Sequence, residues 1–277
     1  MGRFSGVLLA SDYDDTLYNR SGRISPRNRA ALQHFVEEGG LFTISTGRSY
    51  INFAIQMERE RLPVNVPVVL SNGAAIYDFH RGRLLWQSPL PKEAAGHLQL
   101  LCAAYPQLGF EAYYENEVYT FRANGVTRHH LKRCCLEGLP REIQEMPGPW
   151  VKVILQHEDP AYLNQVQEEL CLVWGDFYEV TFSNPYLLEV TAKGANKGSA
   201  VEWVAQELGI RGEDVYCVGN GLNDISMLAV SAVPYAPSDC YQELKDWGAV
   251  LLPPCDEDCI AHLIGVLEER YQDRKEP

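Results

Sequence analysis

The chain has 277 residues, of which 46% are hydrophobic and 22% are charged, as in a globular protein of one large or two modest domains. Its formal net charge of −13 argues against nonspecific binding to nucleic acid and against docking on anionic membranes. No apolar run reaches the length of a membrane span, and the N-terminal run is too short for a signal peptide, so we expect a cytoplasmic protein.

The eight cysteines follow no metal-binding spacing. Cys134 and Cys135 are adjacent and Cys255 and Cys259 are four positions apart, and no Cys-x-x-Cys pair occurs. Structural zinc sites need such pairs or cysteine–histidine combinations at set spacing. We therefore expect reduced and mostly buried thiols.

The first part of the chain alternates apolar runs with helix-like segments, which is typical of a parallel sheet with crossover helices. The predicted strands are Val7–Ala10, Leu41–Ser45 and Val68–Ser71. Ser25 and Pro26 are typical of a helix N-cap and first turn, and Gly39-Gly40 is expected to end that helix. A second helix is expected to end near Glu60.

The middle of the chain has a different texture, with aromatic-rich strands and a hairpin turn at Glu115-Asn116. The predicted strands there are Leu84–Gln87, Phe110–Tyr114, Val118–Arg122, Val151–Gln156, Phe177–Phe182 and Leu187–Thr191. The predicted helices are Pro91–Tyr105, Val126–Leu136 and Ala161–Leu172, and Pro140–Pro149 is expected to be a loop. We expect residues 81–188 to form a separate α+β module inserted into a domain made of residues 1–80 and 189–277.

The first texture returns near the C-terminus. The predicted helices are Asn196–Leu208, Ile225–Val230 and Asp258–Tyr271, and the predicted strands are Val215–Val218, Ala232–Tyr235 and Ala249–Leu252.

Four polar signals stand at predicted strand ends or helix starts: Asp12/Asp14, Thr46, Lys197 and Asn220/Asp224. Because the carboxyl ends of parallel strands lie at one edge of a sheet, these groups can converge although they are far apart in the chain. Burying unpaired carboxylates is costly, so Asp12 and Asp14 need a cation or a ligand beside them.

These residue types suit phosphoryl transfer. Asp12 can attack phosphorus, while Asp14 can protonate the leaving oxygen and then activate water. Thr46 can bind phosphate oxygens at a helix start, and Lys197 can offer positive charge to the phosphate and to Asp12. The acidic and amide oxygens suit Mg²⁺, which prefers hard oxygen ligands, with Mn²⁺ as an alternative.

Each signal also has an ordinary interpretation when it is taken alone. Asp12 and Asp14 could form an acidic turn, Thr46-Gly47-Arg48 a helix cap, and Lys197 a solvated lysine. Asn72-Gly73 and Asn220-Gly221 are typical turn sequences. The functional interpretation therefore depends on the joint occurrence of these signals, in order, at predicted element ends.

Together these motifs resemble those of the haloacid dehalogenase-like phosphatase superfamily and, within it, the Cof-type group with an inserted C2 cap. The motifs that carry the likeness are Asp12–Leu17, Ser45–Arg48, Ser71–Ala74, Lys197-Gly198 and Gly219–Leu228. The likeness covers nearly all of residues 5–80 and 189–270, whereas the cap is matched only by position and size.

The resemblance implies an α/β fold, with a Rossmann-like parallel-sheet core domain and an inserted α+β (C2-type) cap domain. It implies that Asp12 is the nucleophile, which forms an aspartyl phosphate, and that Asp14 is the acid/base. The implied catalytic set is Asp12, Asp14, Lys197 and Thr46. The implied substrate-binding set is Thr46, Gly47, Arg48, Asn72, Lys197 and Asn223, and the implied Mg²⁺ ligands are Asp12, Asp14, Asn220 and Asp224.

Two positions depart from the family pattern. The family often has glycine where this chain has Asp15, which adds negative charge near the site. The usual aspartate of the last motif is Asn220, whose amide oxygen can still bind Mg²⁺ but with one formal charge fewer. We expect weaker metal binding rather than its loss.

The cap is rich in aromatic residues: Tyr113, Tyr114, Tyr119, Phe121, Trp150, Phe177, Tyr178 and Phe182. Aromatic residues on strands are more often core than ligand platforms, so we expect one face of this sheet to pack on cap helices and the other to face the core domain. Candidates for substrate contact are Arg48, Arg122, His129 and His130, although a surface or capping role is the simpler interpretation of the two histidines.

The sequence thus predicts a Mg²⁺-dependent phosphatase that hydrolyses a small phosphorylated metabolite, for which a sugar phosphate is expected. A phosphomutase on the same fold is a second hypothesis. A non-catalytic protein that binds a phosphometabolite is a third, and Asn220 is the feature that favours it. The sequence does not indicate the oligomeric state.

Overall fold

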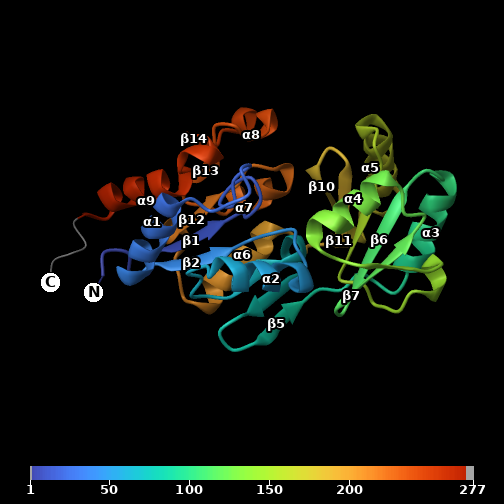
Figure 1. The fold of residues 1–277 in the computed structure, drawn as a ribbon, viewed down its shortest axis with the longest axis horizontal. Helices are drawn as coiled ribbons and strands as arrows, with labels where there is room; N and C mark the ends of the chain where they lie inside the picture. The colour runs from blue at the N-terminus through green and yellow to red at the C-terminus, as the bar shows by residue number, and fades with distance from the viewer. Residues whose placement is uncertain (1, 273–277) are drawn as a thin grey trace.

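The structure is a computed structural model and describes residues 2–272. The chain forms two lobes: segments from both ends of the sequence make one lobe, and the middle of the sequence makes the other (Figure 1). We call them the core domain and the cap.

A parallel five-stranded sheet forms the centre of the core domain, with strand order β14-β13-β12-β1-β2. Its strands are β1 (Leu8–Ser11), β2 (Leu41–Ile44), β12 (Val215–Val218), β13 (Pro234–Pro237) and β14 (Val250–Leu252). In register, Leu8 lies beside Leu41 on one side and Val215 on the other. The residues that follow β1, β2 and β12 therefore meet at one edge of the sheet.

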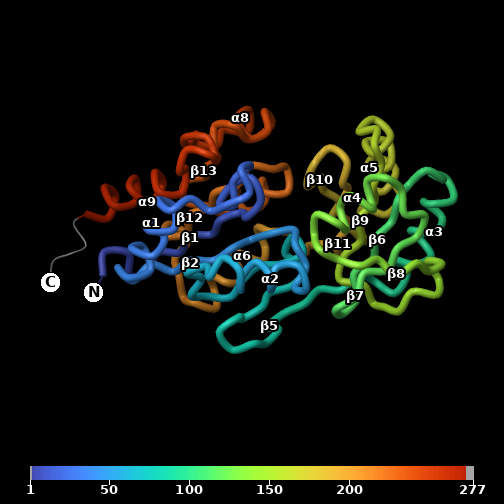
Figure 2. The backbone as a smooth tube through the Cα atoms, viewed as in Figure 1, coloured from blue at the N-terminus to red at the C-terminus, as the bar shows by residue number. Residues whose placement is uncertain are grey.

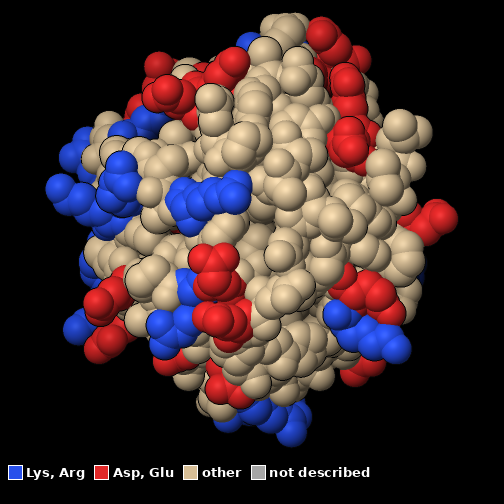
Figure 3. All heavy atoms as spheres, turned by 90° about the vertical axis from the view of Figure 1, so that its right-hand side faces the viewer, with Lys and Arg blue, Asp and Glu red and all other residues tan. Residues whose placement is uncertain are grey.

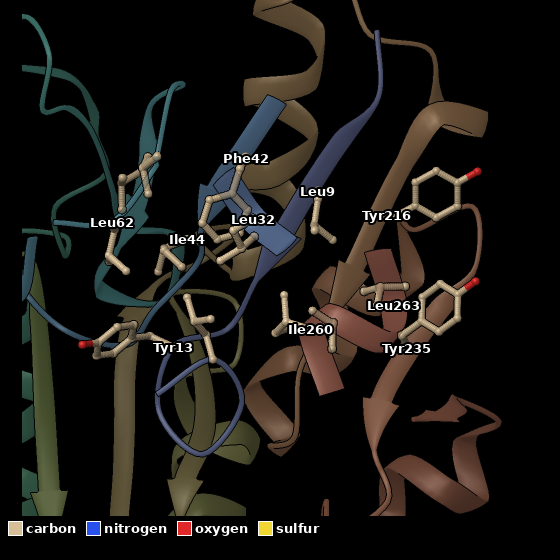
Figure 4. Close-up of a cluster of buried hydrophobic side chains, with 14 of the residues drawn as sticks. Leu9, Tyr13, Leu32, Phe42, Ile44, Leu62, Tyr216, Tyr235, Ile260 and Leu263 are labelled. Atoms are coloured by element: carbon tan, nitrogen blue, oxygen red, sulfur yellow. The ribbon is translucent and has the colours of Figure 1, made fainter. Parts of the chain in front are cut away.

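Helices cover both faces of this sheet. One face carries α1 (Pro26–Glu37), α2 (Tyr50–Glu60) and α9 (Cys259–Arg270), and the other carries α6 (Lys197–Glu207), α7 (Ile225–Ala229) and α8 (Gln242–Trp247). Because strand side chains alternate, Leu9 and Tyr216 face α9 whereas Leu8 and Cys217 face α6. Figure 4 shows Leu9 and Tyr216 beside Leu263 of α9 in this apolar cluster.

The start of α1 confirms the predicted helix N-cap. The Ser25 hydroxyl accepts a hydrogen bond from Asn28 N at 3.0 Å, and Pro26 is the first helical residue. The helix ends before Gly39, whose φ of +87° suits a glycine.

A small antiparallel sheet extends the core domain. It consists of β3 (Val68–Leu70), β4 (Ala75–Asp78) and β5 (Arg83–Gln87), and the short 3₁₀ turn η1 (Ser71–Gly73) joins its first two strands. A bridge between Ser45 and Val69 connects this sheet to the end of β2.

The cap is a six-stranded sheet of order β10-β11-β9-β6-β7-β8, antiparallel except between β7 and β8. Its strands are β6 (Gly109–Tyr114), β7 (Glu117–Phe121), β8 (Gly138–Pro140), β9 (Lys152–Gln156), β10 (Tyr178–Asn184) and β11 (Leu187–Ala192). Helices α3 (Ala94–Ala104) and α5 (Pro160–Trp174) cover one face, and α4 (Gly125–Cys134) lies on the other. The tube view in Figure 2 shows α4 and β11 on the side of the cap that faces the core domain.

The two faces of the cap sheet differ in chemistry. On β9, Val153 and Leu155 point into the apolar cap core, whereas Lys152 and Gln156 point away from it and are still almost fully buried. Most of the cap aromatics belong to the apolar core, as predicted, and Tyr113 is the one of the eight that lines the pocket described below.

The fold class predicted from the sequence is confirmed: a parallel-sheet core domain carries an inserted α+β cap. The strands β4 and β8 and the helix α8 were not predicted, and neither were the 3₁₀ turns, among them η2 (Ile143–Glu145). The expected loop Pro140–Pro149 contains the last residue of β8 and all of η2. Because β8 is a three-residue edge strand that ends in proline, its sequence carries almost no strand pattern.

The pairing of the strands favours domain boundaries that differ slightly from the predicted ones, which lie between residues 80 and 81 and between residues 188 and 189. β5 pairs with β4 and so lies with the core domain, whereas β11 pairs with β9 and β10 as far as Ala192. We therefore propose that the cap runs from about residue 88 to about residue 192.

Acidic and basic side chains are interspersed on the cap end of the molecule, with uncharged surface between them (Figure 3). All eight cysteines are free thiols, and five of them are buried: Cys102, Cys217, Cys240, Cys255 and Cys259. Within residues 2–272, no helix has the length and apolar character needed to cross a bilayer.

Gly198 provides a test of the close approach between α6 and α7. A Cβ at this position would lie 2.2 Å from the Ser226 carbonyl oxygen, so we expect Gly198→Ala to lower the free energy of unfolding by about 2 kcal/mol or more. Urea unfolding followed by circular dichroism measures the change.

The matched control is Gly265→Ala in α9, where an added Cβ meets no atom within 4 Å. This variant should be unchanged or more stable by up to about 1 kcal/mol, because alanine is the better helix former. Equal stability of the two variants would contradict the predicted clash.

Candidate active site

Asp12 directly follows β1, at the carboxyl edge of the parallel sheet. Its backbone N donates to Val218 O at 2.8 Å, which continues the β1–β12 pairing by one residue and fixes where the side chain starts. The side chain of Asp12 reaches Lys197, whose Nζ donates to Asp12 Oδ1 and to Asp224 Oδ1 at 2.6 Å each. Lys197 is the first residue of α6 and is 1% exposed, so one buried ammonium joins two carboxylates from different strands.

Asp224 is fully engaged by its own loop. Its second oxygen accepts hydrogen bonds from the backbone N of Asn220 at 2.9 Å and of Gly221 at 2.8 Å. Gly219 leaves the room for this arrangement, since a Cβ there would lie 2.4 Å from the Asp224 carboxyl carbon. Both oxygens of Asp224, a predicted metal ligand, thus have partners in the protein.

The cluster of Asp12, Asp224 and Lys197 carries two carboxylates for one ammonium. Burial and the neighbouring Asp224 raise the pKa of Asp12 to about 7, although Lys197 lowers it. Burial lowers the pKa of Lys197, but the two carboxylates outweigh burial and hold that pKa above its ordinary value. The site therefore has an excess of negative charge that a bound cation would offset.

Asn220 lies among the oxygens that would hold such a cation. With its amide nitrogen turned toward them, it donates to Asp12 Oδ2 at 3.3 Å, to the Asp14 carbonyl at 3.2 Å and to Thr16 Oγ1 at 3.1 Å. With its amide oxygen turned inward, it accepts from the Thr16 hydroxyl at 3.1 Å. An aspartate in its place could not act as a donor, so the amide can stabilise these oxygens without a metal and can also present an oxygen to one.

These oxygens fit a hard divalent cation. A carboxylate oxygen of Asp12, the carbonyl of Asp14 and the amide oxygen of Asn220 are the kind of ligands that Mg²⁺ takes together with water. Among the described residues, no group of three or more Cys, His, Asp or Glu side chains has the arrangement of a metal site.

Asp14 is held by Arg48. Nε and Nη2 of Arg48 donate to the two oxygens of Asp14 at 2.8 and 2.7 Å, and its Nη1 donates to Asn52 Oδ1 at 2.6 Å. Burial lowers the pKa of Arg48, but the bidentate contact with Asp14 outweighs burial and holds that pKa above its ordinary value. The guanidinium therefore stays charged. Arg48, predicted as a substrate contact, is thus bound to the predicted acid/base in this conformation.

Asp15 has a left-handed backbone with φ +55°, a conformation that glycine adopts without strain and that aspartate tolerates. Its side chain is half-buried at the pocket, and burial together with Asp14 raises its pKa.

The segment after β2 and the turn after β3 form the other side of the site. Asn72, with φ +53°, donates from its backbone N to the Thr46 carbonyl at 3.0 Å, and its Oδ1 accepts from Asn223 Nδ2 at 3.0 Å. Thr46 Oγ1 accepts from Arg48 N at 3.1 Å, which leaves the hydroxyl hydrogen to donate to a ligand. The structure thus brings Thr46, Gly47, Asn72 and Asn223 together.

The cap closes the pocket with a buried ion pair. Lys152 Nζ donates to Glu189 Oε2 at 2.8 Å and to the Gly47 carbonyl at 2.7 Å, so it links two cap strands to the segment after β2. Lys152 is 3% exposed and Glu189 is 4% exposed. We did not predict either residue, although a charged residue within an apolar strand is the signal that could have indicated them.

A second buried polar group lies in the cap wall. His130 Nδ1 contacts Glu111 Oε2 at 3.0 Å, and Gln156 Nε2 donates to Glu111 Oε1 at 2.6 Å. Burial lowers the pKa of His130, but its contacts with Cys134 and Glu111 outweigh burial and raise the pKa to about 10. His130 lines the pocket, as do Arg133 and Cys134 of the same helix.

Two predicted substrate contacts lie elsewhere. Arg122 Nη1 donates to the Cys102 carbonyl at 2.8 Å, and its guanidinium lies over the Phe121 ring, so it is a structural residue of the cap. His129 is exposed on α4 and is not part of the pocket wall. Neighbouring helix positions point in different directions, which is why His130 reaches the pocket and His129 does not.

The family model of the haloacid dehalogenase-like hydrolases matches residues 9–264. This chain belongs to that family. The hydrolase is similar to the 5-amino-6-(5-phospho-D-ribitylamino)uracil phosphatase YwtE of Bacillus subtilis (strain 168), with 24% identity over 94% of this chain and 97% of that protein. It is also similar to the HMP-PP phosphatase of Serratia proteamaculans (strain 568), with 26% identity over 93% of each chain.

Solved structures share the fold. The hydrolase superposes on the subclass IIB sugar phosphatase BT4131 with a TM-score of 0.80 at 20% identity, covering 94% of this chain and 98% of that one. A haloacid dehalogenase-like hydrolase from Bacteroides thetaiotaomicron gives a TM-score of 0.79 at 23% identity, with 94% and 99% coverage. The predicted family and the predicted class of enzyme, a Cof-type hydrolase of phosphoric monoesters, are thus confirmed.

Asn220 gives a first test of the site. Asn220→Asp removes the amide donor from Asp12 and Asp14 and adds a charge, so the unfolding temperature without metal should fall by about 3–6 °C. Mg²⁺ should then raise the unfolding temperature of the variant more than that of the wild type, because the new carboxylate binds the cation. Thermal unfolding with EDTA and with Mg²⁺ measures both effects.

The matched control is Asn116→Asp, an exposed change in the cap hairpin. Its response to Mg²⁺ should equal that of the wild type. An equal Mg²⁺ response in Asn220→Asp would show that residue 220 does not touch the metal.

His130 gives a test of pH dependence. Its pKa is raised from 6.5 to about 10, so the stabilisation from its charged form is complete below pH 6.5 and is lost as the pH rises through 10. The difference in unfolding free energy between wild type and His130→Gln should therefore shrink across this range. Urea unfolding at a series of pH values measures it.

His129→Gln, an exposed change on the same helix, is the control for the substitution of a histidine by glutamine. A constant difference for His130→Gln would mean that the imidazole is not held as a cation between Glu111 and Cys134.

Proposed function

We propose that this hydrolase is a Mg²⁺-dependent phosphatase that cleaves a small phosphomonoester through an aspartyl phosphate on Asp12. The observation that carries the proposal is the contact of Asp12 with the buried Lys197 ammonium, at the floor of a polar pocket that also contains Asp14. A carboxylate held in one orientation beside a cation is suited to in-line attack on phosphorus.

In the proposed first step, an oxygen of Asp12 bonds to phosphorus and the bond from phosphorus to the ester oxygen breaks. Asp14 gives its proton to the departing oxygen, which leaves as an alcohol. In the second step Asp14 takes a proton from water, and the resulting hydroxide attacks phosphorus and returns Asp12 as a carboxylate. Thr46 and Lys197 stabilise the charge that develops on the transferred group.

Asp12, the carbonyl of Asp14 and Asn220 would hold the Mg²⁺, with Asp224 supporting their loop. When bound, the cation would neutralise charge on the phosphoryl oxygens and on Asp12.

Asp14 has to leave Arg48 before it can reach a substrate as an acid, because the guanidinium donates to both of its oxygens. We propose that a substrate phosphate competes for Arg48 and frees Asp14. Arg48 would then move from the acid/base to the substrate, in agreement with its predicted substrate contact.

The pocket wall supports a polyhydroxylated substrate such as a sugar phosphate. Its lining includes the hydrogen-bonding side chains Asn52, Ser183, Asn184 and Tyr241, whereas Leu136 and Leu187 are its apolar members. Such a wall suits hydroxyl groups better than an apolar leaving group. We propose a small cytosolic phosphorylated metabolite as the substrate and assign no role to nucleic acid or membranes.

The test is phosphate release from a panel of sugar phosphates and other phosphomonoesters, with Mg²⁺ and with EDTA. Asp12→Asn should lower turnover by at least about 10³-fold, because the amide is not a nucleophile, and EDTA should abolish release by the wild type. Circular dichroism should show that the variant is folded.

Asp15→Asn is the matched control, since asparagine tolerates the left-handed backbone at this position. It should retain most of the turnover. Release by Asp12→Asn at the wild-type rate would remove Asp12 as the nucleophile, and transfer of the phosphoryl group back to the substrate would indicate a mutase.

A further inference from the structure

The last turn of α4 brings a thiol to the pocket wall. Cys134 Sγ lies 3.5 Å from His130 Nε2, and both residues line the pocket together with Asp12 and Arg48. The backbone carbonyl of Cys134 accepts from Asn52 Nδ2 at 3.1 Å, which ties the end of α4 to α2 of the core domain. The proposed phosphatase chemistry uses neither Cys134 nor His130.

A chain of buried hydrogen bonds orients the imidazole. His130 Nδ1 contacts Glu111 at 3.0 and 3.1 Å, and Glu111 is 0% exposed. Tyr113 Oη at 2.8 Å and Gln156 Nε2 at 2.6 Å donate to Glu111 and fix its carboxylate. The order of thiol, imidazole and carboxylate places a cation, positioned by a third group, beside a nucleophile, which is one way in which proteins activate a cysteine.

The surroundings of the sulfur are electropositive. Glu111 favours the protonated imidazole, whose Nε2 lies 3.5 Å from the Cys134 sulfur, and a cation beside a cysteine is typical of reactive thiols. The guanidiniums of Arg48 and Arg133 line the same pocket. The carbonyl end of α4 acts in the opposite direction, but its partial charge is smaller than that of one full cation.

The other cysteines differ from Cys134. Five of the eight are buried, and Cys135 and Cys171 are exposed. Within residues 2–272, Cys134 is the one cysteine whose sulfur contacts an imidazole.

We propose that Cys134 is a reactive thiol that is modified reversibly by low-molecular-weight disulfides, and that this modification obstructs the active-site pocket. The thiol and its orienting groups do not depend on the proposed function, whereas the loss of turnover rests on it.

The modification is a thiol–disulfide exchange. The Cys134 thiolate attacks one sulfur of a disulfide such as oxidised glutathione, a Cys134–sulfur bond forms, and the bond between the two glutathione sulfurs breaks. Cys134 is oxidised to the mixed disulfide, and the leaving glutathione is reduced to a thiolate that takes up the proton Cys134 gave up. An excess of thiol reverses the reaction. The added tripeptide would stand among the residues that line the entrance to Asp12.

The first experiment measures alkylation of each cysteine in the native full-length protein by iodoacetamide at neutral pH, using peptide mass spectrometry. Cys134 should react about ten-fold faster than its exposed neighbour Cys135, although Cys134 is less accessible. His130→Gln should reduce the rate at Cys134 to near that of Cys135 and leave Cys135 unchanged.

The buried Cys217 reports on folding, because its alkylation in a variant would indicate unfolding. If His130→Gln unfolds, the alkylation rates of Cys134 and Cys135 in the wild type are sufficient to test the proposal. A rate at Cys134 equal to or below that at Cys135, or an unchanged rate in a folded His130→Gln, overturns the proposal.

The second experiment treats the protein with oxidised glutathione and follows phosphate release. Wild type and Cys135→Ser should lose at least about nine-tenths of their turnover and regain it with dithiothreitol. Cys134→Ser should keep the rate of its own untreated sample, and equal inhibition of this variant overturns the proposed obstruction.

The two experiments separate the two proposals. Fast labelling of Cys134 in a protein that releases no phosphate contradicts the proposed function and leaves the reactive thiol supported. Phosphate release by a protein whose Cys134 is unreactive contradicts only the inference drawn here.

Discussion

One buried ammonium ties together three segments that are far apart in the chain. Lys197 at the start of α6 contacts Asp12 after β1 and Asp224 after β12, and none of the three side chains is more than about a tenth exposed. Removing one partner of such a cluster leaves an uncompensated buried charge and typically costs about 3–5 kcal/mol. The loop after β12, the position of Asn220 and the orientation of Asp12 all depend on this contact.

The same cluster links the stability of the core domain to the chemistry proposed for Asp12. Without a metal, the cluster has an excess of negative charge, which Asn220 partly offsets by donating hydrogen bonds from its amide. An aspartate at this position would increase the excess. Asparagine at position 220 thus offers a bound cation one negative charge fewer than aspartate would. At the same time it lowers the energetic cost of the metal-free state.

Local signals made much of the core domain predictable. Ser25 and Pro26 mark the start of α1, and the residues after β1, β2 and β12 converge as parallel strands require. The roles of the site residues come from the resemblance and stay predictions. Asp15 has a left-handed backbone conformation, which a single sequence does not indicate. Aspartate tolerates this conformation but also occurs in many others.

Contacts between segments that are far apart in the chain were not predictable. The ion pair of Lys152 and Glu189 forms between two strands of the cap, and its position over Gly47 depends on docking. The pairing of Arg48 with Asp14 depends on side-chain geometry across neighbouring strands. Strand β5 looked like part of the cap because its pairing partner β4 was not recognised. The hydrophobic periodicity of one segment does not indicate which other segment it will contact.

The insertion of the cap also sets the order in which the molecule can be completed during synthesis. β1 is made early, yet its neighbour β12 follows only after the whole cap has been translated, whereas every strand of the cap has its partners within one continuous stretch. The cap can therefore fold on the ribosome while one side of β1 still lacks its partner. Until α6 and β12 emerge, Asp12 has neither Lys197 nor the Val218 carbonyl beside it, so the nascent core domain exposes an unpaired apolar strand that ends in a carboxylate. A chaperone that holds this strand would act on the protein before its active site exists.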